Sequence, residues 1–103
     1  MIHVVAIITA KPGQRDTMLS AFRANIPAVR AEDGCIEYNP VIDAEGVGSF
    51  QARIGGDAFM VIEKWRDLAA LKAHAASPHM AAYGAKVKDF IATRTVHVLS
   101  SAE

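Results

Sequence analysis

The feature that most constrains the fold is the alternation of side chains along residues 58–65, AFMVIEKW. A strand places successive side chains on opposite faces of a sheet. The first face of the expected strand carries Phe59, Val61, Glu63 and Trp65, and the second carries Met60, Ile62 and Lys64. Because apolar residues occur on both faces, each face of the sheet needs a cover.

Three other segments are predicted to be strands. Residues 2–10 are rich in β-branched side chains and stop at a Pro-Gly pair. Residues 35–42 have strand character, but Pro40 has no N–H for a ladder and favours an edge or a bulge. Residues 94–100 alternate cleanly and complete the set.

Between these strands the apolar residues follow the helical period. A first helix is expected from Gln14 to near Gly34, with a kink at Pro27. Asp67 is expected to cap a short second helix, and Ser77 a third whose first residue is proline. The apolar stripes are Leu19, Phe22, Ile26 and Val29, then Leu68, Leu71 and Ala75, then Met80, Tyr83, Val87 and Phe90.

The segment 43–57 holds four of the seven glycines and also an alternating piece, residues 49–54. A loop of this length inside a small domain is often functional or carries an extra strand. We therefore expect a hairpin flap here.

The order β-α-β, β-α-α-β predicts an α+β fold of the ferredoxin-like, split-βαβ type within a single domain, 1–103. Its antiparallel sheet carries helices on one face only. A second copy is the expected cover for the other face, since the chain is 51% hydrophobic and has a formal net charge of zero. A homodimer is therefore predicted.

Composition excludes several function classes. Eleven basic and eleven acidic residues are interspersed, so no positive field favours nucleic acid. No glycine-rich phosphate loop and no G-x-S-x-G motif is present. Cys35 is the only cysteine and is expected in the core of a cytoplasmic protein, and the apolar run 2–10 is too short to span a membrane.

Five motifs together resemble the antibiotic biosynthesis monooxygenase (ABM) family and its quinol monooxygenases. They are the EKW ending of a strand at 63–65, His74, the SPH opening of a helix at 77–79, AKPG at 10–13 and EDGCIEY at 32–38. The resemblance covers nearly the whole chain. It implies ferredoxin-like protomers that pair into a dimeric α/β barrel, with a pocket between the sheet and the helices of each protomer.

The resemblance also implies a chemistry. Several members of the family oxidise quinols or anthrones with O₂ and use neither a metal nor an organic cofactor. Ground-state O₂ is a triplet and reacts slowly with closed-shell molecules, so the substrate must first become an electron-rich anion. The expected partners are thus a small aromatic substrate, O₂ and a second copy of the chain, with no nucleic acid and no membrane.

Candidate site residues follow from these needs. A base is expected in His79 or His74, because imidazole titrates near neutral pH. Glu63 is expected to orient a histidine or to take a proton itself, and the walls that stack on a ring are expected to be Trp65, Phe59, Tyr83 and Phe90. His3 and His97 are expected on the surface or in the dimer contact.

Each candidate also has a structural interpretation. His74 could bond a backbone carbonyl near a helix end, and His79 could cap a helix. Glu63 could instead bond a backbone amide or Arg66. Trp65 and Tyr83 are expected in the core in any case.

Other activities compete with the oxidation. Together with Glu63, the two histidines could form a two-His-one-carboxylate metal triad, but neither a tight H-x-x-x-H nor an H-x-H spacing supports it. A haem-degrading branch of the same superfamily uses a strand-one asparagine, whose place is taken here by Val5 or Ala6. Isomerisation of a small carbonyl compound, and aromatic binding without turnover, remain the alternatives.

Overall fold

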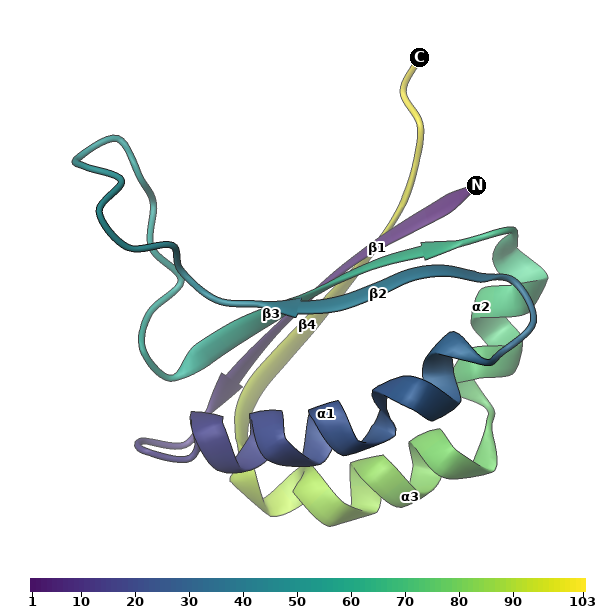
Figure 1. The fold of residues 1–103 in the computed structure, drawn as a ribbon, viewed down its shortest axis with the longest axis horizontal. Helices are drawn as coiled ribbons and strands as arrows, with labels where there is room; N and C mark the ends of the chain where they lie inside the picture. Colours follow the sequence, from purple (N-terminus) through teal and green to yellow (C-terminus); the bar gives the residue numbers. More distant parts are fainter.

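One four-stranded antiparallel sheet forms the centre of the molecule, with its helices below it in Figure 1. The computed structural model describes all residues, 1–103. Its elements are β1 (Ile2–Ala10), α1 (Arg15–Arg30), β2 (Cys35–Val41), β3 (Ala58–Trp65), α2 (Leu68–Ala75), α3 (Pro78–Val87), a 3₁₀ turn (Lys88–Phe90) and β4 (Ile91–Ser100).

The strand order is β2-β3-β1-β4, and every neighbouring pair is antiparallel. This is the ferredoxin-like arrangement that the element order predicts. β1 and β3 are central, and β2 and β4 form the edges. The edge position explains how Pro40 is tolerated in β2, because an edge strand leaves one row of N–H groups without a partner. The bulge in β2 lies elsewhere, between Cys35 and Glu37.

The core lies between the sheet and the helices. Burial along β3 alternates as its sequence predicts, with Phe59 and Trp65 fully buried on the helix side and Met60 and Ile62 half-buried on the other side. Cys35 is half-buried at the edge of this core rather than inside it. α1 contributes its apolar stripe to the core through Met18, Leu19, Phe22 and Val29.

The helix boundaries differ from the predictions at one end. Both predicted N-caps are confirmed: the Asp67 carboxylate accepts from Ala70 N at 2.8 Å, and the Ser77 hydroxyl accepts from Met80 N at 3.4 Å. α1 continues through Pro27 but ends at Arg30, four residues before Gly34. The intervening turn carries Glu32 toward α2.

The predicted apolar stripe of α2 was wrong in part: Leu71 packs against the core, but Leu68 and Ala75 are exposed. Ala70 and His74 are the buried residues of this helix, whereas Leu68 is 46% exposed. α2 is thus rotated so that His74 is buried and Leu68 is exposed.

Gly34 fixes how closely α2 approaches the sheet. Its φ is +84°, and a Cβ at this position would lie 2.6 Å from Cβ of Ala70. Its carbonyl accepts from Arg66 N at 2.8 Å. Only glycine combines this backbone conformation with so close a contact.

The predicted hairpin flap was also wrong, because residues 49–54 form no strand. The segment between β2 and β3 is an irregular loop that extends away from the helices in Figure 1. Asp43 closes it, accepting from Ile54 N and Gly55 N at 2.9 Å each. These hydrogen bonds replace the strand-to-strand hydrogen bonds that a hairpin would form. Positive φ values at Gly46, Gly48 and Gly55 also interrupt the extended backbone that a strand needs.

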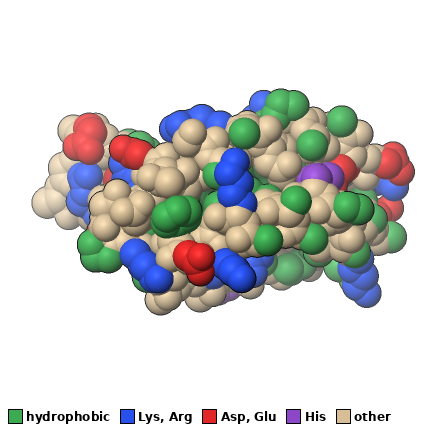
Figure 2. Space-filling view, turned by 90° about the horizontal axis from the view of Figure 1, so that it is seen from below, with side chains coloured by type: hydrophobic (Ala, Val, Ile, Leu, Met, Phe, Trp, Pro, Cys, Tyr) green, Lys and Arg blue, Asp and Glu red, His purple; other side chains and the backbone are tan.

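The surface carries charges of both signs. Figure 2, a view from the side of the helices, shows basic and acidic side chains interspersed with apolar atoms. His3 and His97 lie on the helix-free face of the sheet, in register with Lys64 and Val5 respectively. No helix has the length and apolar character needed to cross a membrane.

Candidate active site

An apolar cavity lies between the sheet and the helices, and we call it the inner cavity. Its volume is about 80 Å³. Three aromatic rings lie in its wall: Phe22 of α1 stacks on Tyr38 of β2 at 5.2 Å between ring centroids and meets the edge of Tyr83 of α3 at 5.9 Å. Aliphatic side chains of β1 and β3, such as Ile8 and Val61, complete the apolar lining.

Five polar side chains also line the inner cavity: Tyr38, Glu63, His74, Tyr83 and Arg94. No hydrogen bond within the protein engages the hydroxyl groups of the two tyrosines or Nε2 of the histidine. The only fully buried side-chain nitrogen or oxygen without a partner lies elsewhere, at Nε of Arg15. The free polar atoms of the cavity are therefore open to a small molecule.

The two tyrosines remain neutral phenols. Burial raises the pKa of Tyr83 to about 12 and raises the pKa of Tyr38 further. A neutral phenol can donate a hydrogen bond to an oxyanion. The cavity is therefore lined by two tyrosines that can donate an O–H and by Arg94 of β4, an exposed cation that forms no salt bridge but attracts the charge of Glu63.

Glu63 lies on β3 beside Trp65. Nε1 of Trp65 donates to a carboxylate oxygen of Glu63 at 2.9 Å, and both residues are buried. Burial raises the pKa of Glu63, while the indole hydrogen bond and the nearby His74 act in the opposite direction. The partner is thus an indole, and neither a backbone amide nor Arg66 takes that place.

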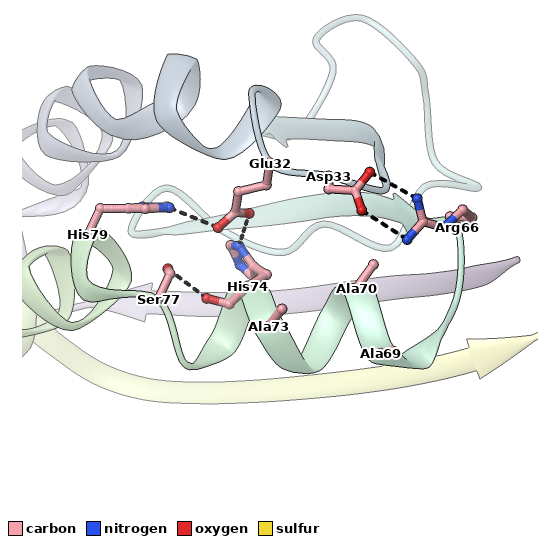
Figure 3. A pocket seen from close by; sticks show the side chains of 9 residues that line it. All are labelled: Glu32, Asp33, Arg66, Ala69, Ala70, Ala73, His74, Ser77 and His79. Carbon is pink, nitrogen blue, oxygen red and sulfur yellow. Dashed lines mark hydrogen bonds and ion pairs between the residues drawn. The ribbon is translucent and has the colours of Figure 1, made fainter.

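A second carboxylate joins the two histidines. Glu32 lies in the turn between α1 and β2, and Figure 3 shows its side chain between His74 of α2 and His79 of α3. One oxygen lies 2.7 Å from Nδ1 of His74, and the other lies 2.8 Å from Nε2 of His79. We call these three residues the Glu32 fork.

Asn25 of α1 completes the contacts of His79. Its Nδ2 lies 3.3 Å from Nδ1 of His79. Both ring nitrogens of His79 are therefore engaged, one by an amide and one by a carboxylate. His74 has only its Nδ1 engaged, which leaves Nε2 as its free nitrogen.

On its outer side the Glu32 fork borders a surface groove of about 470 Å³. Ala69, Ala73 and Ser77 form part of its wall, and the Arg66 guanidinium pairs with both oxygens of Asp33 at 3.0 and 3.2 Å across one end (Figure 3). His79 lines this groove but not the inner cavity, whereas His74 lines both.

The predicted site residues are therefore brought together only in part. Glu63, His74 and Tyr83 line the inner cavity. Trp65 lies behind the wall, 4.6 Å from the His74 ring between centroids. Trp65 is thus one of four predicted residues that do not line the cavity; the others are Phe59 in the core, Phe90 in the 3₁₀ turn and His79 in the Glu32 fork.

Sequence reasoning missed Glu32, Tyr38, Phe22 and Arg94 as site residues. Glu32 lies in a turn, where acidic residues are common. Its role depends on its contact with α2, which is distant in sequence and which no local pattern predicts. Tyr38 could have been found, because it shares the helix side of the sheet with Glu63, its register partner. Arg94 occupies the first position of the predicted strand 94–100, and the pattern gives no sign that this edge borders the cavity.

The metal triad suggested by residue type is not assembled. His74 and His79 are joined by Glu32, while Glu63 bonds Trp65. No group of three or more His, Cys, Asp or Glu side chains has an arrangement that could hold a metal ion.

Comparison with known proteins identifies relatives across the chain. The family described as Antibiotic biosynthesis monooxygenase matches residues 1–86. A protein of Escherichia coli named "Probable quinol monooxygenase YgiN" is 37% identical over 101 residues, which is 96% of each chain.

Solved structures have the same fold. PA3566 from Pseudomonas aeruginosa superposes with a TM-score of 0.81 at 27% identity, over 99% of this chain and 94% of the other. Rv0793 from Mycobacterium tuberculosis superposes with a TM-score of 0.80 at 28% identity, over 99% and 95%.

Proposed function

The chain belongs to the antibiotic biosynthesis monooxygenase family, and on that premise we propose that it oxidises a quinol or another electron-rich aromatic with O₂ in the inner cavity. One observation supports this proposal: His74, whose Nε2 forms no hydrogen bond within the protein, and Glu63 both line an aromatic-walled cavity. The proposed oxidation requires an apolar cavity that contains a base.

His74 serves as the base in this proposal. Its Nε2 takes the phenolic proton of the quinol, and a positioned general base contributes roughly 10²–10⁴-fold to the rate of such a step. The hydroxyls of Tyr38 and Tyr83 and the guanidinium of Arg94 stabilise the resulting anion by hydrogen bonds and charge.

The overall reaction balances without an added reductant. The quinol anion gives an electron to O₂, and the new C–O bond forms a peroxide anion on the ring. Protonated His74 returns its proton to the outer oxygen of the peroxide. One oxygen atom stays on the ring and the other leaves as water, whose two hydrogens come from the substrate, so that a quinol and O₂ become a hydroxyquinone and water.

Substrate entry requires the inner cavity to enlarge. A volume of about 80 Å³ is the space of a few water molecules at about 30 Å³ each. Met80 and Tyr83 are its half-buried wall residues on α3. Tyr83 also lines an outer hollow of about 230 Å³ between α1 and α3, so movement of its ring would join the two spaces. Met80 has a flexible side chain that can repack around a ring.

The functional unit in this proposal is a homodimer that pairs through the helix-free face of the sheet. Four apolar side chains lie on that face in the two central strands: Val5, Ile7, Met60 and Ile62. None is covered by a helix of the same protomer. A second copy covers them symmetrically and leaves the inner cavity on the opposite side of each sheet.

The test is O₂ consumption with a panel of quinols and anthrones. The wild type should consume O₂ with at least one of them, and His74→Ala should lose at least about 10²-fold of that rate. Lys72→Ala is the matched control, because Lys72 is exposed on the same helix as His74, lines neither the inner cavity nor the surface groove, and should leave the rate unchanged. Thermal stabilisation by these compounds without O₂ consumption would instead indicate a binding protein and contradict the proposal.

A further inference from the structure

We propose that Glu32 is a positioning residue that fixes the tautomer of His74, and that His79 holds Glu32 in place. The inference rests on the proposed function, because it assigns a role toward the base of that reaction. Its basis is the Glu32 fork, in which one carboxylate reaches two imidazoles through its two oxygens.

The hydrogen bonds of His74 determine which of its nitrogens is basic. A carboxylate only accepts, so His74 must donate Nδ1–H to Glu32. A neutral imidazole carries one proton, and Nε2 is then left with a free lone pair. In this tautomer the free nitrogen is the one that can take a proton from a molecule in the inner cavity. The other tautomer would leave Glu32 without one of its donors.

The backbone keeps Glu32 in position on both sides. Its N–H donates to the carbonyl of Val29 at 3.0 Å, and its carbonyl accepts from Cys35 N at 3.2 Å. Its side chain is 17% exposed. The turn is thus closed by hydrogen bonds, and the carboxylate is directed between α2 and α3.

His79 occupies the second oxygen of Glu32. Because Nδ2 of Asn25 is a donor, it supplies a hydrogen to Nδ1 of His79, and the remaining Nε2–H of His79 then donates to Glu32. Both ring nitrogens of His79 are therefore engaged in hydrogen bonds to protein side chains. His79 therefore orients Glu32, and His74 is the base.

Glu32 also balances the charge that the reaction places on His74. A protonated imidazole in an apolar cavity is costly without a partner. The Glu32 carboxylate lies 2.7 Å from its Nδ1, so the imidazolium forms as one half of an ion pair. The single carboxylate can balance one imidazolium, and His74 is the ring that lines the cavity.

The decisive measurement is ¹⁵N NMR of the histidine rings in the wild type at about pH 8, above the usual range of imidazole titration. His74 should be found as the Nδ1–H tautomer. In Glu32→Gln the amide keeps only one accepting oxygen, so we expect a mixture of tautomers at His74. Glu32→Ala removes both acceptors and should shift His74 further.

Kinetics with an active quinol provide the second readout. In Glu32→Gln we expect kcat to fall by roughly 10²-fold, with KM changed by less than about threefold, because the variant alters the base and not the cavity wall. Asp33→Asn is the matched control: it removes the neighbouring carboxylate, which pairs with Arg66 on the surface, and should change neither kcat nor the His74 tautomer.

The two proposals can fail separately. An Nε2–H tautomer of His74 in the wild type would overturn the positioning role, whatever the activity. An Nδ1–H tautomer that persists in both Glu32 variants would also overturn it. An Nδ1–H tautomer that depends on Glu32, in a protein that consumes no O₂ with any quinol, would support the positioning and contradict the oxidation. If Glu32→Ala does not fold, the spectra of the wild type and of Glu32→Gln still test the positioning role of Glu32.

Discussion

Nε1 of Trp65 donates a hydrogen bond of 2.9 Å to a carboxylate oxygen of Glu63, two residues earlier on the same buried face of β3. This bond satisfies the indole N–H inside the core and orients the carboxylate at the edge of the inner cavity. The other carboxylate oxygen has no partner in the protein. A buried acid with one free oxygen affects both stability and chemistry.

Glu63→Gln should stabilise the fold at neutral pH. Burial raises the pKa of Glu63 above its usual value of 4.5, so the folded state binds the proton more tightly than the unfolded state does. Stability attributable to this group is complete below pH 4.5 and is lost as pH rises through the folded-state pKa. Glutamine keeps an oxygen for the indole and carries no charge.

The measurement for Glu63→Gln is denaturant unfolding of both proteins at pH 7 and at pH 4. The variant should have the higher free energy of unfolding at pH 7, and the difference should shrink at pH 4. Because all other groups are common to both proteins, their titration cancels in the difference. A difference that does not change with pH would contradict the assigned shift.

Gly34→Ala should destabilise the protein by more than Gly13→Ala does. Both glycines have positive φ, +84° and +78°, so each substitution pays a similar backbone cost of about 1 kcal/mol. Only at Gly34 does the new Cβ meet another atom, Cβ of Ala70 at 2.6 Å. We expect an additional loss of about 1–3 kcal/mol, measured by chemical denaturation. Equal losses would show that α2 moves aside freely.

Ala6→Val should abolish ligand binding with little effect on stability. Ala6 is buried in β1 and lines the inner cavity, so the added methyl groups have space to occupy. Ala10→Val is the matched control: Ala10 is buried on the same face but lies away from the cavity, and overpacking there should cost about 1–3 kcal/mol. Thermal stabilisation by a naphthoquinone should be absent in Ala6→Val. Retained stabilisation would place the ligand elsewhere.

Ile62→Lys should convert a dimer into a monomer. The residue lies on the helix-free face of β3, where a charge at the centre of an apolar contact is costly. Leu68→Lys is the control, since Leu68 is already 46% exposed on α2. Sedimentation velocity should show twice the chain mass for the wild type and the control. A monomeric wild type would contradict the proposed assembly.

Local patterns predicted the sheet and the helix caps well. The alternation of β3 and the caps Asp67 and Ser77 depend on residues close in sequence, and each was confirmed. The predicted flap was wrong: Ile54 N and Gly55 N donate to the carboxylate of Asp43, eleven and twelve residues earlier in the sequence, and residues 49–54 form no strand. No local sequence pattern predicts a hydrogen bond between residues so far apart in the chain.

The candidate site was harder to predict, for the same physical reason. Of the residues that residue type selected, Glu63, His74 and Tyr83 line the inner cavity. Their partners are separated in sequence: Glu32 lies 42 residues from His74 and 47 from His79. The rotation of α2, which directs His74 and not Leu68 to the sheet, follows from the close approach at Gly34 and not from the helical stripe.

The most direct test of monooxygenase function is the fate of labelled oxygen. The protein is incubated with an active quinol under ¹⁸O₂, and the product is analysed by mass spectrometry while peroxide is assayed in parallel. We predict a hydroxyquinone that carries one ¹⁸O atom, no accumulation of hydrogen peroxide, and loss of this product in His74→Ala. An unlabelled quinone formed together with hydrogen peroxide would contradict oxygen insertion and identify a simple oxidase.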